Sequence, residues 1–248
     1  MNGQPAVILV PGAWSGAWVW EPTTEELRRR GLRAEAVTLR GLEADQPRSV
    51  IAAVHLEDHV EQVAALVTRR TDPVVLVGHS YSSMVTAQVA DRLNRQVVGL
   101  IHFGGFMPTD GRSLLDDWSD SPSARDRERQ EIVDAGDLWP PPEPRLLEQE
   151  WDLTETNRDF LARHFTLHPG RTVTDPARLN ADTAVQPTTY VILSPEEIST
   201  ASRATEAAAP TGWRVEHLVS GHWPMLSRPD EVVDLIVREV VRYGAGQG

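Results

Sequence analysis

The 248-residue sequence contains no cysteine and no lysine. Without cysteine, disulfide bonds, thiolate metal sites and cysteine nucleophiles are excluded. Without lysine, every basic side chain is an arginine, which excludes Schiff-base chemistry on a lysine and an ATP site built on a P-loop lysine. These two absences remove several classes of enzyme mechanism before any motif is considered.

The sequence also lacks long hydrophobic runs and an excess of positive charge. The first apolar run, residues 6–10, stops at Pro11 and Gly12, and it is too short for a signal-peptide core or a membrane span. The formal net charge is -12, whereas a nucleic-acid-binding surface needs clustered basic side chains. We therefore expect a cytoplasmic protein that binds neither nucleic acid nor membrane. The sequence carries no signal for an oligomeric state.

Short apolar runs rich in β-branched residues alternate with amphipathic helical patterns along the chain. This alternation is typical of a parallel sheet covered by helices on both faces. A chain of this length is expected to form one domain. The predicted class is α/β, with a mostly parallel sheet of about six strands flanked by helices. The predicted strands are residues 6–10, 33–39, 73–77, 96–103, 188–193 and 214–219.

Residues 108–187 interrupt this alternation. They contain tryptophans, prolines and dense charges but no strand pattern. A structureless loop of this length would be unusual inside a compact domain, so a mostly helical insertion is expected. We predict a core formed by residues 1–107 and 188–248, with a cap or lid formed by residues 108–187 within the same domain.

The stretch "GHSYS", residues 78–82, follows an apolar strand and opens a helical pattern. In a strand-to-helix elbow, a nucleophilic serine has a strained backbone, and the residues two before and two after it must be small. Gly78 and Ser82 meet this requirement, although the usual pattern ends in glycine. Ser80 is therefore predicted to be a nucleophile; its alternative role is that of a helix N-cap.

A serine hydroxyl needs a base that is itself oriented by a third group. His222 lies in a glycine-containing loop after the last predicted strand, at the carboxyl edge of the sheet where ligands bind. Two acids compete for the third role: Glu196 follows the strand 188–193, and Asp110 follows the strand 96–103. Either carboxylate could hold the imidazole and stabilise its charged form. We favour Glu196.

Backbone N–H groups are expected to form an oxyanion hole near the nucleophile. Tyr81, directly after Ser80, and Ala13, in the loop after the first strand, are the predicted donors. Trp14, His79 and Trp223 are predicted to line the substrate pocket.

His55 and His59 are four residues apart on one predicted helix, a spacing that hints at metal ligation. The stretch lacks the His-Glu-x-x-His order and a third ligand, so a solvated helix face is favoured. No metal site and no organic cofactor are predicted.

Four motifs follow one another along the chain: "LVPGAWSGAWVWEPTTEELRRRG", "VVLVGHSYSSMV", "LIHFGGFMPTDGRS" and "SGHWPMLSRPDEV". Together they resemble the α/β-hydrolase fold superfamily, in the branch of plant methylesterases, hydroxynitrile lyases and small bacterial esterases. The resemblance covers nearly the whole chain except the predicted cap. It implies that Ser80 is the nucleophile, that Ala13 and Tyr81 supply the oxyanion donors, and that Glu196 occupies a position where the family usually has Asp.

The sequence departs from this branch in further ways. Pro11 replaces the family's histidine before Gly-Ala-Trp. The hydroxynitrile lyases have a lysine after the catalytic histidine, where this chain has Trp223. Cyanohydrin cleavage is therefore not expected.

The predicted function is a serine hydrolase that cleaves carboxylic esters of small to medium apolar substrates through an acyl-enzyme, with a small-molecule ester as its partner. Ser82 and Pro11 alter the surroundings of the site, so a receptor-like protein that binds ligands without hydrolysing them is one alternative. A tailoring enzyme that uses the same triad for lactone, thioester or cyclisation chemistry is another.

Overall fold

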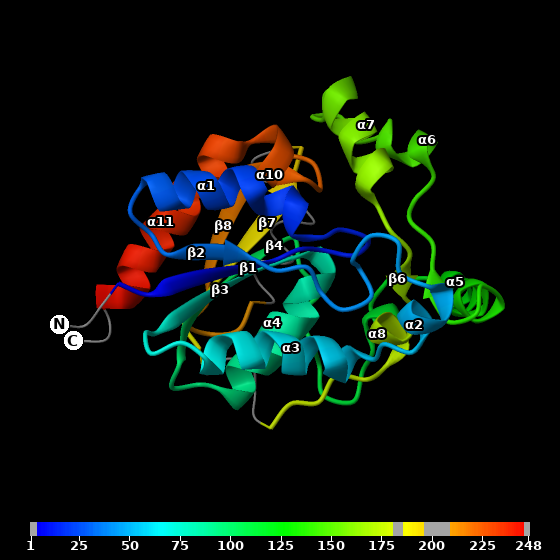
Figure 1. Cartoon of the computed structure of the whole chain (residues 1–248), viewed down its shortest axis with the longest axis horizontal. Helices are drawn as coiled ribbons and strands as arrows, with labels where there is room; N and C mark the ends of the chain where they lie inside the picture. The colour runs from blue at the N-terminus through cyan, green and yellow to red at the C-terminus, as the bar shows by residue number, and fades with distance from the viewer. Residues whose placement is uncertain (1–3, 181–185, 196–208, 246–248) are drawn as a thin grey trace.

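The computed structural model describes residues 4–180, 186–195 and 209–245 (Figure 1). Within these residues, six strands form one sheet in the order β2-β1-β3-β4-β7-β8. Every neighbouring pair in this sheet is parallel, which confirms the predicted fold class. The strands are β1 (Ala6–Val10), β2 (Ala34–Ala36), β3 (Val74–His79), β4 (Val97–Phe103), β7 (Thr188–Ser194) and β8 (Arg214–Val219).

Helices cover both faces of the sheet. Figure 1 shows α1 (Glu21–Arg29) and α11 (Pro229–Ala245) on one side of it, and α3 (Leu56–Thr68) and α4 (Ser83–Arg92) on the other. Successive residues of a strand point to opposite faces. Leu9 of β1 accordingly packs in the hydrophobic cluster that contains α1 and α11, whereas Ile8 packs in the one that contains α3 and α4. Residues of β1, β3 and β4 are therefore buried along their whole length.

The segment between β4 and β7 leaves the sheet, and we call its residues 108–180 the insertion. Figure 1 shows its helices α5, α6 and α7 on the side of the molecule away from the two chain ends. Its elements are η3 (Leu114–Asp116), α5 (Pro122–Asp134), β5 (Leu138–Trp139), α6 (Pro144–Leu147), α7 (Glu155–His164), β6 (His168–Pro169) and α8 (Arg171–Thr174). β5 and β6 pair as a small antiparallel sheet.

Short elements complete the part of the chain that is described. They are η1 (Ala17–Trp20), α2 (Arg48–Ala52), η2 (Ser80–Ser82) and α10 (Pro224–Ser227). None of the helices within the described ranges is long and apolar enough to cross a membrane.

The parallel arrangement fixes where a site can form. The loops after β1, β3, β4 and β8 all leave the same edge of the sheet, because parallel strands have their carboxyl ends on one side. These loops carry Ala13, Ser80, Phe106 and His222 respectively.

Candidate active site

The turn after β3 holds Ser80 in an unusual backbone conformation. Its φ angle is +52°, in the left-handed region that non-glycine residues rarely adopt. Ser80 is also only 8% exposed. A strained backbone of this kind persists only where surrounding structure enforces it, and such residues cluster at functional sites. The geometry is that of the strand-to-helix elbow expected from the sequence.

Ser82 forms the hydrogen bonds that hold this turn. Its Oγ accepts a hydrogen bond from the N–H of His79 at 2.8 Å and donates to the carbonyl oxygen of Val10 at 2.7 Å. The serine that departs from the usual glycine therefore links the end of β3 to the end of β1. The hydroxyl of Ser80, in contrast, forms no hydrogen bond to another described residue and caps neither η2 nor α4.

The loop after β4 closes over the same turn. The N–H of Phe106 donates to the carbonyl oxygen of Ser80 at 3.3 Å. A Cβ atom on Gly105 would lie 1.8 Å from the Oγ of Ser83, closer than any real contact. Only glycine therefore allows this loop to approach the nucleophile turn.

Ser80 opens into a cavity of about 350 Å³ that His222 also lines. The structure thus brings the predicted nucleophile and the predicted base to one cavity, although their side chains are not hydrogen-bonded to each other. In ligand-free enzymes such bonds are often long and tighten when substrate binds. The lining residues are Ala13, Trp14, Ser80, Tyr81, Phe106, Leu114, Trp118, Trp139, Pro142, Leu146, Leu147, Glu150, His222 and Trp223.

The imidazole of His222 is crowded by protein. Burial lowers its pKa to about 4, because desolvation disfavours the charged form. The ring is therefore neutral at pH 7 and free to accept a proton. The ring of His79 lies 4.8 Å from that of His222, and its Nε2 donates to the carbonyl oxygen of His222 at 2.7 Å.

The three predicted pocket residues take different places. Trp14 and Trp223 line the cavity. His79 is fully buried and is not among the lining residues; it lies behind His222 and Trp223. Gly12 makes room for it, because a Cβ at Gly12 would lie 2.7 Å from Nδ1 of His79.

Two carboxylates of the insertion hold the loop that carries His222. The N–H of Gly221 donates to Oδ2 of Asp152 at 2.7 Å, and the N–H of His222 donates to Oε2 of Glu150 at 2.9 Å. Burial raises the pKa of Glu150, while the hydrogen bond from His222 opposes that shift. We call these two contacts the carboxylate latch. No spacing pattern in the sequence marks either acid.

The two candidate triad acids differ in what the structure reports. Glu196 lies outside the described residues. Asp110 is exposed, and its Oδ1 accepts a hydrogen bond from the N–H of Leu179 at 3.0 Å. Among the described residues, no carboxylate forms a hydrogen bond with the ring of His222. The choice of Glu196 therefore stays a prediction.

The two predicted oxyanion donors lie beside Ser80. Ala13 and Tyr81 both line the cavity, and neither backbone N–H donates a hydrogen bond within the described part of the chain. Free backbone donors next to a nucleophile are what an oxyanion hole requires. Trp14, which follows Ala13, has a φ angle of +61°, so the loop after β1 turns at this residue.

Buried histidines anchor the surroundings of both donors. Nε2 of His59 donates to the carbonyl oxygen of Arg40 at 2.7 Å, so its Nδ1 accepts from the hydroxyl of Tyr81 at 2.7 Å. Nδ1 of His168 accepts from the N–H of Trp14 at 3.3 Å. Burial lowers the pKa of His59 to about 4 and also lowers that of His168. Both rings are therefore neutral at pH 7.

The expectation that His59 lies on a solvated helix face is wrong, because its ring is fully buried. The buried hydroxyl of Tyr81 needs a partner, and His59 supplies it. His55 instead pairs with Asp175, through Nδ1 at 2.8 Å from Oδ2. Across the described ranges there is no group of three or more side chains placed to hold a metal ion.

Known proteins resemble this chain in sequence. A carbendazim hydrolyzing esterase from Nocardioides sp. is 36% identical over 44% of the chain, and Methylesterase 3 of Arabidopsis thaliana is 33% identical over 41%. These alignments cover only 45% and 40% of the two relatives. A probable esterase of Oryza sativa is 24% identical over 98% of this chain and 99% of its own length.

Solved structures share the fold over nearly the full length. An extracellular alpha/beta-hydrolase from a Paenibacillus species superposes with a TM-score of 0.77, covering 94% of this chain and 98% of that one at 16% identity. A methylesterase protein from Arabidopsis gives 0.74, covering 96% and 99% at 16% identity. The sequence profile of the alpha/beta hydrolase family matches residues 7–235. With the elbow at Ser80 on a parallel sheet, this match shows that the chain belongs to the alpha/beta hydrolase family.

Proposed function

We propose that this protein is a serine hydrolase that cleaves carboxylic esters of small to medium apolar substrates. One observation carries the proposal: Ser80, held at a φ of +52° with its hydroxyl unengaged, lines the same cavity as the neutral imidazole of His222. The similarity to proteins named as esterases supports the same chemistry.

In the proposed reaction, His222 removes the proton of the Ser80 hydroxyl while the oxygen attacks the ester carbonyl. The backbone N–H groups of Ala13 and Tyr81 stabilise the negative charge that develops on the carbonyl oxygen. His222 then gives its proton to the leaving alkoxide, and an acyl-enzyme remains. His222 then deprotonates a water molecule whose oxygen attacks the acyl carbon, and it returns this proton to Oγ of Ser80 as the acid leaves. Glu196 is the proposed acid that orients the imidazole.

The substrate class follows from the wall of the cavity. Most of its lining residues are apolar, and Trp14, Trp118, Trp139 and Trp223 provide flat aromatic surfaces. Such a wall suits small esters with an aromatic or branched apolar group. Several lining residues come from the insertion, which supports residues 108–187 as a cap over the site. A cytoplasmic location and the absence of a cofactor complete the proposal.

Replacement of Ser80 by alanine tests the proposal. We expect kcat/KM for p-nitrophenyl acetate to fall by at least about a thousandfold, with an unchanged circular dichroism spectrum. A fluorophosphonate probe should label the wild type at Ser80 and leave Ser80→Ala unlabelled. Ser83→Ala is a matched control, because the Ser83 hydroxyl is buried and has no hydrogen-bond partner among the described residues.

Full turnover by Ser80→Ala would remove Ser80 from the mechanism. A wild-type protein that binds esters but neither hydrolyses them nor reacts with the probe would be a ligand-binding protein instead. Turnover of lactone or thioester substrates, with no turnover of simple esters, would identify a tailoring enzyme.

A further inference from the structure

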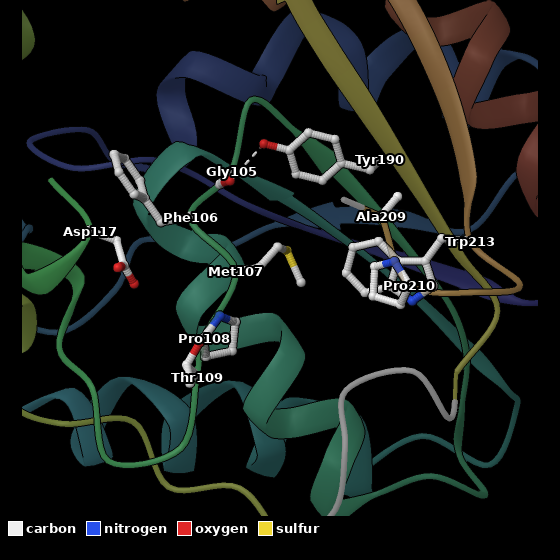
Figure 2. Close-up of a pocket in the computed structure, with 10 residues that line it drawn as sticks. All are labelled: Gly105, Phe106, Met107, Pro108, Thr109, Asp117, Tyr190, Ala209, Pro210 and Trp213. Carbon is white, nitrogen blue, oxygen red and sulfur yellow. Dashed lines mark hydrogen bonds between the residues drawn. The ribbon is translucent and has the colours of Figure 1, made fainter. Parts of the chain in front are cut away.

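A second cavity of about 410 Å³ lies beside the catalytic one (Figure 2). Figure 2 shows Phe106 and Asp117 at one end of it and Pro210 and Trp213 at the other. Phe106 lines both cavities, and it is the residue they share among those described. The lining residues are Gly105, Phe106, Met107, Pro108, Thr109, Asp117, Tyr190, Ala209, Pro210 and Trp213.

Phe106 is tied to the nucleophile by its backbone and to the catalytic cavity by its ring. Its N–H donates to the carbonyl oxygen of Ser80 at 3.3 Å. Its ring stacks on that of Trp118, with centroids 6.2 Å apart and planes inclined by 24°, and Trp118 lines the catalytic cavity. Phe106 therefore lies at the boundary between the two cavities.

The chemistry of the second cavity is largely apolar. The hydroxyl of Tyr190 is already engaged, because it donates to the carbonyl oxygen of Gly105 at 2.8 Å (Figure 2). Asp117 is exposed and paired with Arg112 at 2.6 Å. The ring of Trp213 stacks beside that of Tyr190, with centroids 6.5 Å apart. Methyl, methylene and ring carbons fill such a space more favourably than charged groups.

We propose that Phe106 is the residue that limits substrate length, because it closes the second cavity to the apolar arm of a longer ester. This inference rests on the proposed function. With its ring stacked on Trp118, Phe106 confines a substrate to the catalytic cavity. When the ring is removed, the two cavities join, and an alkyl arm that starts at the Ser80 hydroxyl reaches the surfaces of Tyr190 and Trp213.

The test compares long and short esters in Phe106→Ala. The measured quantity is the ratio of kcat/KM for p-nitrophenyl decanoate to that for p-nitrophenyl acetate. We expect this ratio to rise at least about tenfold over wild type, because several further methylene groups become buried. The ratio for decyl acetate against methyl acetate covers the case in which the long arm belongs to the alcohol. No rise in either ratio would overturn the proposal.

A second substitution shows whether the added length occupies the second cavity. Ala209→Trp fills that cavity from the end opposite Phe106, so the double variant Phe106→Ala/Ala209→Trp should lose the gain. Leu146→Ala is the matched control, because it enlarges the catalytic cavity without opening the second one. Any change that Leu146→Ala causes in the ratio of kcat/KM should be the same with and without Ala209→Trp. A gain that survives Ala209→Trp would overturn the proposal.

Binding measured without turnover separates this inference from the proposed function. Calorimetric titration of Ser80→Ala and Ser80→Ala/Phe106→Ala with methyl decanoate and decyl acetate should show at least about tenfold tighter binding to the double variant for one ester. Equal affinities overturn the inference even if the enzyme hydrolyses short esters. Tighter binding in a protein without hydrolysis supports the cavity and refutes the hydrolase. Should Phe106→Ala not fold, Phe106→Leu is used with the same criteria.

Discussion

The proposed nucleophile and the proposed base of this site are held by different parts of the molecule. Ser80 is fixed within the core: β3 leads into its turn, and Ser82 links that turn to the end of β1. His222 sits on a loop whose N–H groups point to the insertion, where Glu150 and Asp152 accept their hydrogen bonds. One half of the site belongs to the sheet, and the other half depends on a segment outside it.

This difference has a thermodynamic meaning. The hydrogen bonds around Ser82 are buried, so breaking them should destabilise the whole fold. The carboxylate latch is partly buried and joins two loops, so breaking it should displace His222 while most of the fold remains. Stability and activity should therefore respond together on the nucleophile side and separately on the histidine side.

After the loss expected for Ser80→Ala, the largest expected effect concerns the acid on the histidine side. We expect Glu196→Gln to lower kcat by at least about a hundredfold, because a neutral side chain no longer stabilises the imidazolium of His222. Asp110→Asn should lower kcat less than about threefold, since Asp110 bonds to the N–H of Leu179. Steady-state kinetics on p-nitrophenyl acetate measure both. The reverse ranking would make Asp110 the acid.

On the nucleophile side, Ser82→Ala should reduce stability and activity together. The N–H of His79 and the carbonyl oxygen of Val10 lose their buried partner, which costs about 1–3 kcal/mol. Urea unfolding should show this loss, and kcat should fall about tenfold or more as Ser80 shifts. A variant with wild-type kcat would show that Ser82 does not position the nucleophile.

On the latch, Glu150→Ala and Glu150→Gln should behave differently. Glu150→Ala leaves the N–H of His222 without its acceptor, so we expect kcat/KM to fall about tenfold. Glu150→Gln keeps an acceptor oxygen, so its kcat/KM should fall less than about threefold. Unfolding free energies should change less than in Ser82→Ala. The exposed Glu148 supplies the control Glu148→Ala. Equal losses in both Glu150 variants would indicate that charge, and not the hydrogen bond, matters.

The smallest expected effect is a shift in pH dependence. The pKa of His222 is lowered by burial to about 4, from an ordinary value of 6.5. Activity should therefore persist below pH 6 and fall as pH drops further, because the base becomes protonated. If Glu196 contacts the ring, its charge raises this pKa, and Glu196→Gln should shift the acid limb of kcat/KM to lower pH. An acid limb of kcat/KM with its midpoint at or above pH 6.5, in both the wild type and Glu196→Gln, would contradict the burial of His222.

The stability of the folded state, like the activity, should fall as pH drops. Between pH 6.5 and about 4 the unfolded chain protonates His222 while the folded chain does not, so the folded state loses stability as pH falls through this window. The buried His59, with a pKa of about 4, adds to the same loss. Unfolding measured at each pH separates this loss from the effect on catalysis.

The core half of the site could be predicted from the sequence because local patterns specify it. A hydrophobic strand, small residues around Ser80 and a following helix are adjacent in the chain, and together they predict the turn. Ala13 was predicted as an oxyanion donor from its position in the loop after the first strand. The position of His222 followed from the same edge rule.

The other half could not be predicted, because it depends on contacts between distant segments. Glu150 and Asp152 stand about seventy residues before the loop they bind, and no fixed spacing marks them. His59 was misplaced because its partner, the hydroxyl of Tyr81, reaches it only in the folded protein. Glu196 falls outside the described residues, so its role stays a prediction, as do the catalytic roles of Ser80 and His222.

The carboxylate latch has a consequence for how the proposed enzyme can change. The short stretch from Pro142 to Glu150 lines the cavity and also binds the loop that carries His222. Mutations that reshape the wall for a new substrate therefore risk disturbing the histidine as well. Substitutions in this stretch should therefore be tolerated only where they spare Glu150. Substitutions of Trp118 or Phe106, which lie outside the stretch, are not subject to this constraint.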